Sequence, residues 1–281
     1  MIRAGAAVLL LALALPARAQ DAAAASKDAY TLFDPTPEQD LRAFSTDRPP
    51  KANSPYTVDA GHFQYETDLA VFSRGNDRGV KTLAWTVVDP TLKLGLTNAV
   101  DAELQLTPFE SLASSGVPGA GTVSGVGDSA ARLKYNVLGD DRGDLAVALL
   151  PYVKLPTARS GLGNGKVEGG LIVPIGVNAP GGFTIIAMPE GDVLKDDSGP
   201  GYHPTADFLV NVSHAVDARW TAYAELYASR SFQPGDRNVY TFDTAMTFAW
   251  KPTLQLDFGG NFSLNGAGPR VQLYTGLSQR F

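Results

Sequence analysis

The sequence predicts an all-β fold: a closed antiparallel transmembrane β-barrel of about twelve strands with an N-terminal periplasmic segment. The first observation is the stretch from Val271 to Phe281, in which apolar and polar residues alternate and the last residue is aromatic. Such a period of two indicates a strand between two different media. Its length suits a tilted bilayer-crossing strand, roughly 9 to 11 residues. A strand of a soluble β-sandwich could show the same alternation.

The second observation is an export signal at the N-terminus. Arg3 precedes the apolar run 6–15 and the small-residue site around Ala17 and Ala19, which together predict a secretory signal peptide over residues 1–19. No later run approaches the roughly 18 continuous apolar residues that a membrane helix needs. Since only helices and closed barrels satisfy their backbone polar groups in lipid, a membrane location implies a barrel.

Composition agrees with this class and excludes others. The chain has 281 residues with 29 Gly, 19 Pro, 10 Tyr and 13 Phe, so it is rich in turns and aromatic residues. It has no Cys, which excludes disulfide scaffolds and thiolate zinc sites. The net charge of -6 argues against nucleic acid as a partner. We expect no metal and no cofactor.

The third observation is the alternation of strands and connections. After a periplasmic segment over residues 20–58, the barrel is predicted over residues 59–281. Its strands are expected at 62–72, 81–96, 100–107, 128–138, 145–155, 170–177, 183–193, 205–212, 220–229, 239–250, 254–264 and 270–281. Tight turns alternate with longer Gly-rich loops at 108–127, 156–169 and 194–204, as in bacterial outer-membrane barrels.

Two details test this strand assignment. In the first strand, Leu69 and Val71 are expected to face outward, and the second strand should carry a bulge at Asp89-Pro90, where the alternation slips. Six aromatic residues fall near the periplasmic ends of their strands, where an interfacial girdle is expected. They are Phe63, Tyr135, Phe183, Trp220, Trp250 and Phe281.

Several short motifs resemble a known family. They are FSTDRPP at 44–50, GHFQYE at 61–66, GVGD at 125–128, RLKY at 132–135, VKLPT at 153–157, YAELY at 223–227 and LDFG at 256–259. Together they resemble the outer-membrane transporter family of the meta-cleavage pathway of phenol degradation. This resemblance implies a bacterial outer-membrane location and passive passage of small, aromatic or hydrophobic molecules. The expected partners are outer-membrane lipids, the barrel assembly machinery and the solute.

The alternation also predicts a charged lumen. Ten acidic residues are expected to point inward, against five basic ones, and such groups must be paired or hydrated. The acids are Glu66, Asp68, Asp101, Glu103, Asp128, Asp144, Asp207, Glu225, Asp243 and Asp257. The bases are Lys93, Arg132, Lys134, Lys154 and Arg280. A salt-bridge network that fills the barrel and a polar lining for a solute both explain them.

The Pro-rich stretch 46–50 is the last candidate feature. Arg48 could fold back towards Glu66 and Glu103, so that the segment constricts the periplasmic mouth; a plain linker is the competing interpretation. The candidate pathway residues are therefore Arg48, Glu66, Asp68, Glu103, Asp128, Arg132, Lys134, Lys154, Glu225 and Asp257.

Two other functional classes remain open. One is a non-conducting structural or adhesive barrel. The other is a barrel lipid hydrolase, for which a serine needs a histidine within hydrogen-bond reach. The chain has three histidines, His62, His203 and His214, and no catalytic set is evident around them.

Overall fold

The computed structural model describes residues 27–141 and 143–281, so the predicted signal peptide lies outside the described residues. Two short 3-10 helices, η1 (Lys27–Ala29) and η2 (Glu38–Asp40), precede the strands. The strands are β1 (Phe63–Asp77), β2 (Val80–Thr97), β3 (Val100–Gln105), β4 (Phe109–Ser115), β5 (Gly121–Gly125), β6 (Ser129–Leu138), β7 (Leu145–Leu155), β8 (Glu168–Ile172), β9 (Ile175–Ala179), β10 (Phe183–Lys195), β11 (Tyr202–Ala215), β12 (Trp220–Ser231), β13 (Val239–Lys251), β14 (Leu254–Ser263) and β15 (Pro269–Arg280).

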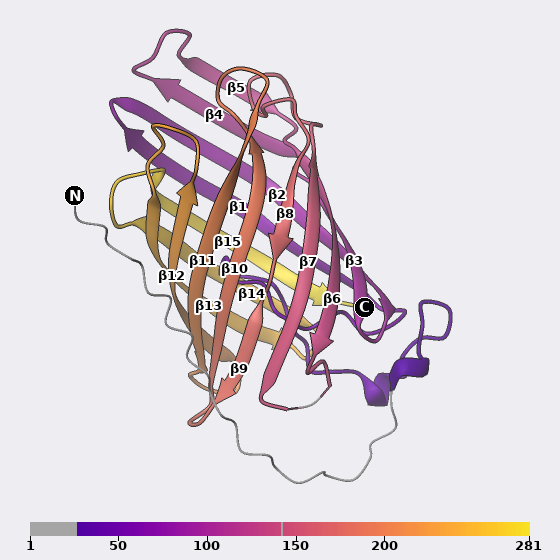
Figure 1. Cartoon of the computed structure of the whole chain (residues 1–281). Helices are drawn as coiled ribbons and strands as arrows, with labels where there is room; N and C mark the ends of the chain where they lie inside the picture. Colours follow the sequence, from indigo (N-terminus) through magenta and orange to yellow (C-terminus); the bar gives the residue numbers. More distant parts are fainter. Residues whose placement is uncertain (1–26, 142) are drawn as a thin grey trace, which may run out of the picture.

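These strands close into one antiparallel barrel (Figure 1). β1 pairs with both β2 and β15, which joins the two ends of the sheet. Three barrel strands are interrupted, because β3 continues as β4, β5 as β6 and β8 as β9 along the same partners. The fifteen segments therefore make a barrel of twelve strands, as predicted. We call the end at which β1 begins and β15 ends the base, and the opposite end the top.

The structure corrects two of the predicted boundaries. The predicted loop 108–127 is mostly strand: β4 pairs with the upper half of β2, and β5 pairs with β4. β2 extends to Val80, so its upper edge needs a partner that the Gly-rich composition did not reveal. The predicted strand 170–177 is broken between β8 and β9 at Pro174, because proline cannot donate to the ladder.

The predicted slip in alternation is present, slightly displaced from Asp89-Pro90. Val87 and Val88 are both 40% exposed, and Val88 has a positive φ of 54°. Opposite it, the β1–β15 register shifts between Asp68 and Ala70. The shift reverses the facing of β1 beyond Leu69, so that Val71 lines an interior cavity, and its predicted outward direction is wrong.

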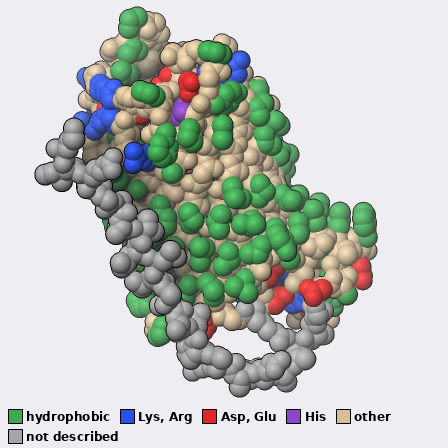
Figure 2. Space-filling view, in the orientation of Figure 1, with side chains coloured by type: hydrophobic (Ala, Val, Ile, Leu, Met, Phe, Trp, Pro, Cys, Tyr) green, Lys and Arg blue, Asp and Glu red, His purple; other side chains and the backbone are tan. Residues whose placement is uncertain are grey.

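The distribution of side chains is inverted relative to a soluble protein. Among the described residues, 23 buried side chains are polar or charged and 12 are hydrophobic, while large hydrophobic residues cover the outside of the wall (Figure 2). The six predicted girdle aromatics all lie at the base end of their strands. The rings of Phe63 and Phe281 are 5.9 Å apart across the β1–β15 seam. Among the described residues, no helix has the length and apolar character to cross a membrane.

The chain between η2 and β1 runs inside the barrel near its base. We call residues 42–60 the inserted segment; most of them from Ala52 onward are buried. Gly95 of β2 allows the backbones to touch, because a Cβ there would lie only 2.0 Å from the carbonyl oxygen of Asp59. The amide of Gly61 donates to the Gly95 carbonyl oxygen at 2.9 Å, which ends the segment on the wall.

Candidate functional site

Asp47 of the inserted segment anchors a buried cluster of charges on β1, β2, β3 and β6. Both of its carboxylate oxygens lie 2.8 Å from the Lys134 ammonium, and the Lys93 ammonium contacts it as well. Glu66 lies 2.6 Å from Lys93, and Glu103 lies 3.3 Å from Lys134. Both lysine side chains are almost fully buried. Asp47 contacts both of them and so joins the inserted segment to a cluster of three carboxylates and two ammonium groups.

Arg48 bridges the two sides of the barrel seam. Its guanidinium contacts Asp68 of β1 at 2.7 Å and Asp257 of β14 at 2.7 and 3.1 Å. The side chain is 13% exposed. Gly276 of β15 leaves room for it, because a Cβ there would lie 2.2 Å from a guanidinium nitrogen. Arg48 does fold back to inward acids, but these are Asp68 and Asp257 rather than the expected Glu66 and Glu103.

A third anchor lies on β12 and β13. The Lys51 ammonium contacts Asp243 and lies 5.0 Å from the centre of the Tyr227 ring. Glu225 accepts hydrogen bonds from the backbone amides of Lys51 at 3.2 Å and Ala52 at 3.1 Å. Because Glu225 accepts from two consecutive amides, it fixes the path of the backbone in addition to the ion pair that holds the Lys51 side chain.

Ala52 carries the segment onto a small apolar floor inside the barrel. It packs with Leu150, Ile172, Met188 and Leu209, which point inward from β7, β8, β10 and β11. All five are at most 6% exposed. The segment is thus held by charges on one side of the lumen and by apolar contact on the other.

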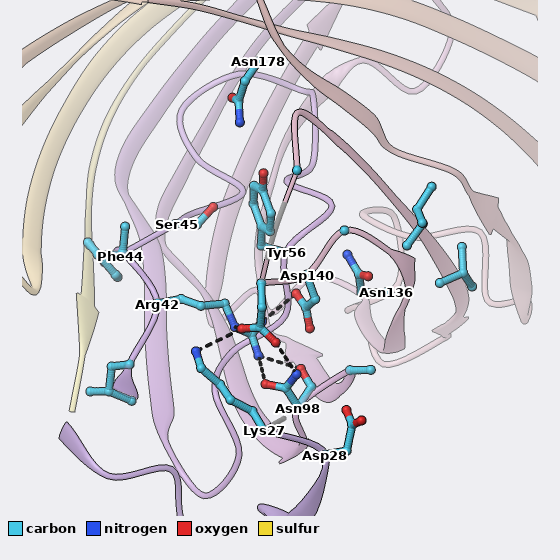
Figure 3. A pocket seen from close by; sticks show the side chains of 18 residues that line it. Lys27, Asp28, Arg42, Phe44, Ser45, Tyr56, Asn98, Asn136, Asp140 and Asn178 are labelled. Carbon is cyan, nitrogen blue, oxygen red and sulfur yellow. Dashed lines mark hydrogen bonds and ion pairs between the residues drawn. The ribbon is translucent and has the colours of Figure 1, made fainter. Parts of the chain in front are cut away.

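At the base, Arg42 ties the start of the segment to two turns (Figure 3). Its guanidinium donates to the Asn98 carbonyl oxygen at 2.6 Å and contacts Asp140 at 2.6 Å and Asp59 at 3.2 Å. Thr57 donates to the other oxygen of Asp140 at 2.9 Å. These contacts link the turn after β2 and the turn after β6 to the inserted segment.

The pKa values of the two acids in the turn after β6 are shifted in opposite directions. Burial raises the pKa of Asp140 to about 6, although Arg42 and Thr57 partly oppose this effect. At Asp141, burial also acts to raise the pKa, but hydrogen bonds from Asn98 and Lys27 outweigh it and the pKa lies below its usual value. Asp140 is therefore a group whose charge at the base changes in mildly acidic conditions.

Three spaces remain around the inserted segment. The upper cavity, about 210 Å³, lies between Arg48, Glu66 and Arg132 above the segment. The base cavity, about 1180 Å³, opens beside Arg42 at the base. The side cavity, about 310 Å³, lies between the segment and the wall at β9–β12.

Most of the predicted pathway residues meet at the inserted segment. Seven of them contact it or its partners: Arg48, Glu66, Asp68, Glu103, Lys134, Glu225 and Asp257. Arg132 donates to Gln105 beside the upper cavity. Asp128 and Lys154 pair at 2.8 Å near the top, far along the strands from the others. The predicted inward Asp144 is wrong, because this residue is exposed in the turn before β7.

Sequence reasoning missed the two partners that come from the segment itself. Asp47 and Lys51 flank Arg48 and place a negative and a positive charge on opposite walls. The signal was present: three charges fall within residues 47–51, between prolines and small residues. The acids Glu190 and Asp192 of β10 were also missed, because the alternation in this strand was not used to assign inward-facing residues.

The three histidines do not form a serine–histidine pair in the described part of the chain. His62 contacts the carbonyl oxygens of Phe281 at 3.1 Å and Thr36 at 2.8 Å. His203 contacts Asp196 at 2.9 Å, and His214 contacts the Gly181 carbonyl oxygen at 3.1 Å. These contacts of the imidazoles are with carbonyl and carboxylate oxygens rather than with hydroxyls.

The closed antiparallel wall, the apolar outer surface, the base girdle and the charged interior define an outer-membrane β-barrel protein. The family model described as "Putative MetA-pathway of phenol degradation" matches residues 46–281, and the chain belongs to this family. The match begins within the inserted segment, so it covers residues 46–60 of this segment together with the barrel.

Solved structures support the same fold. The COG4313 outer membrane channel from Pseudomonas putida F1 has a TM-score of 0.58 at 15% identity, covering 78% of this chain and 93% of that one. The NanC porin has a TM-score of 0.53 at 9% identity, covering 76% and 98%. The β domain of the Bordetella autotransporter BrkA has a TM-score of 0.51 at 11% identity, covering 78% and 98%. A search of curated proteins finds no significant match.

Proposed function

We propose that this protein is an outer-membrane channel that passes small, aromatic or hydrophobic molecules passively. The observation that carries the proposal is the way in which the lumen is filled. A single segment, held mainly by ion pairs and side-chain hydrogen bonds, separates cavities above and below it. A barrel that only served as a scaffold would need no such separable occupant.

The family supports this proposal, and so does the likeness to an outer membrane channel. Twelve strands lie between small barrels filled by side chains and the 16 to 18 strands that enclose a wide aqueous channel. A narrow pathway that opens when the inserted segment shifts fits this size. Its charged lining comprises Arg48, Glu66, Asp68, Glu103, Asp128, Arg132, Lys134, Lys154, Glu225 and Asp257.

The organisation of the chain belongs to the same proposal. Residues 1–19 direct export, residues 20–58 form a periplasmic segment that constricts the lumen, and residues 59–281 form the barrel. Lipid covers the apolar outer surface, and the barrel assembly machinery inserts the protein. The base then faces the periplasm.

Planar-bilayer recording of the purified protein tests this function. We expect discrete conductance steps, interrupted more often as a small neutral aromatic such as phenol is added. Absence of conductance in both the wild type and a variant with a loosened segment, Arg48→Ala, would favour the structural or adhesive barrel. Release of fatty acid from phospholipid vesicles by the wild type would instead favour the hydrolase.

A further inference from the structure

The side cavity differs chemically from the rest of the lumen. Among the described residues that line it, none is Asp, Glu, Lys or Arg. The upper cavity, by contrast, has four acids and four bases in its lining: Asp47, Glu66, Asp68 and Asp89 against Arg48, Lys51, Lys93 and Arg132. The two cavities that adjoin the inserted segment thus differ in the charge of their linings.

The walls of the side cavity are suited to a flat ring. Phe44 and Tyr56 of the inserted segment line it together with Tyr223 of β12 and Ile186 of β10. Aromatic walls bind another ring through offset and edge-to-face contacts in addition to the burial of apolar area. At about 310 Å³, the cavity exceeds the roughly 150 Å³ of an apolar cavity that holds benzene.

Uncharged polar groups complete the lining. Ser45 and Thr46 come from the segment, and Ser213, Thr221 and Gln255 come from the wall. A few hydroxyl and amide groups on a mostly apolar surface orient a ligand without requiring it to be charged. An anion that entered would lose water without gaining a Lys or Arg partner from the described lining, which disfavours it. The imidazole in the lining, His214, already has its Nε2 3.1 Å from the Gly181 carbonyl oxygen.

The side cavity opens towards the base. Phe44, Ser45, Tyr56 and Asn178 line both the side cavity and the base cavity, so the two spaces share a boundary. In Figure 3, Ser45, Tyr56 and Asn178 lie away from the charged cluster around Arg42 and Asn98. The opposite edge is bounded by the layer of Arg48, since Thr46 donates to the Arg48 carbonyl oxygen at 2.7 Å and accepts from Gln255 at 3.3 Å.

We propose that the side cavity is a binding site for a small uncharged molecule with one aromatic ring, and that this solute passes beside the inserted segment through it. The proposal rests on the channel function for the passage, whereas the binding itself does not. Phe44, Tyr56 and Tyr223 contact the ring, and the neighbouring hydroxyl and amide groups bind its polar substituent. Movement of Arg48 opens the upper edge.

Equilibrium binding to the protein in lipid nanodiscs tests the site. Benzyl alcohol and benzoate are the probes, because they share a ring and differ in charge; saturation-transfer NMR against empty nanodiscs reports binding. We expect saturable binding of benzyl alcohol and at least tenfold weaker binding of benzoate. Equal binding of the two probes, or no binding of benzyl alcohol above that of empty nanodiscs, overturns the proposal.

Matched variants locate the site. Thr221→Trp fills the side cavity and should weaken benzyl alcohol binding at least tenfold, whereas Thr91→Trp fills the upper cavity and should leave it unchanged. The reverse pattern overturns the proposal. If Thr221→Trp fails to fold, Tyr223→Leu takes its place. This variant removes one ring at small cost in volume and should weaken benzyl alcohol binding severalfold. Because no flux is measured, a failure here leaves the channel function standing, and a protein without conductance can still bind.

Discussion

Replacement of Arg48 by Ala tests whether the inserted segment controls the lumen. The change leaves Asp68 and Asp257 without their shared cation at the seam, and Asp257 is fully buried. Removing one partner of a buried ion pair costs about 3 to 5 kcal/mol. About 1.4 kcal/mol corresponds to a factor of ten in an equilibrium constant. The equilibrium constant that favours the docked segment over the undocked one should therefore fall by roughly two to four orders of magnitude.

We therefore expect Arg48→Ala to raise single-channel conductance or to make it fluctuate. We also expect it to lower the unfolding temperature of the barrel, measured by the heat-dependent change in its migration in gel electrophoresis. Arg237→Ala is the matched control, because Arg237, in the loop before β13, pairs at 2.6 Å with Asp77 at the end of β1, and both side chains are over a third exposed. Such a pair contributes about 0 to 1 kcal/mol. If Arg48→Ala matches Arg237→Ala in conductance and in stability, the segment is a linker and the reasoning is wrong.

Three other predictions concern topology, selectivity and pH. An epitope inserted at Gly119 or Gly163, in the β4–β5 tip and the loop after β7, should be labelled on intact cells; labelling only in broken cells would contradict the orientation. Inward acids outnumber inward bases along the wall, so the reversal potential across a KCl gradient should show cation preference, and phenol should pass better than benzoate; clear anion selectivity would refute this. Burial raises the pKa of Asp140 from its ordinary value of 3.8 to about 6, so its protonated form stabilises the folded state. This contribution, at most about 3 kcal/mol, is complete below about pH 4 and is lost as pH rises through about 6. Asp140→Asn should remove this decline in urea titrations and Asp141→Asn should not.

The barrel could be predicted from sequence because its wall has a simple rule. Every lipid-facing position must be apolar and every second position faces inward, so residues such as Leu273 and Ser278 reveal the facing of whole strands. The rule failed where the ladder is irregular. Val71 reversed its facing because of a register shift, and Pro174 divided a strand that composition alone made continuous.

The site was harder to predict because some of its residues belong to the inserted segment, where the strand alternation of apolar and polar residues does not apply. Alternation placed Lys93 and Lys134 in the lumen, but nothing in the strands indicated that Asp47 would lie between them. The alternation also predicted a charged lumen, with ten acids against five bases, and indicated no uncharged cavity within it. The uncharged lining around Tyr56 and Tyr223 became apparent only when the segment was seen against the wall.

The position of Arg48 also bears on how the barrel is completed. The seam between β1 and β15 joins the two ends of the sheet, and such distant pairing carries the largest loop-closure cost in the fold. Arg48 contacts Asp68 on one side of this seam and Asp257, one strand beyond, on the other. Its full set of contacts exists only when the barrel is closed, and the closed seam is in turn stabilised by Arg48. Seating the segment and sealing the wall are therefore thermodynamically coupled, so a residue that occupies the finished lumen also helps to complete the wall around it.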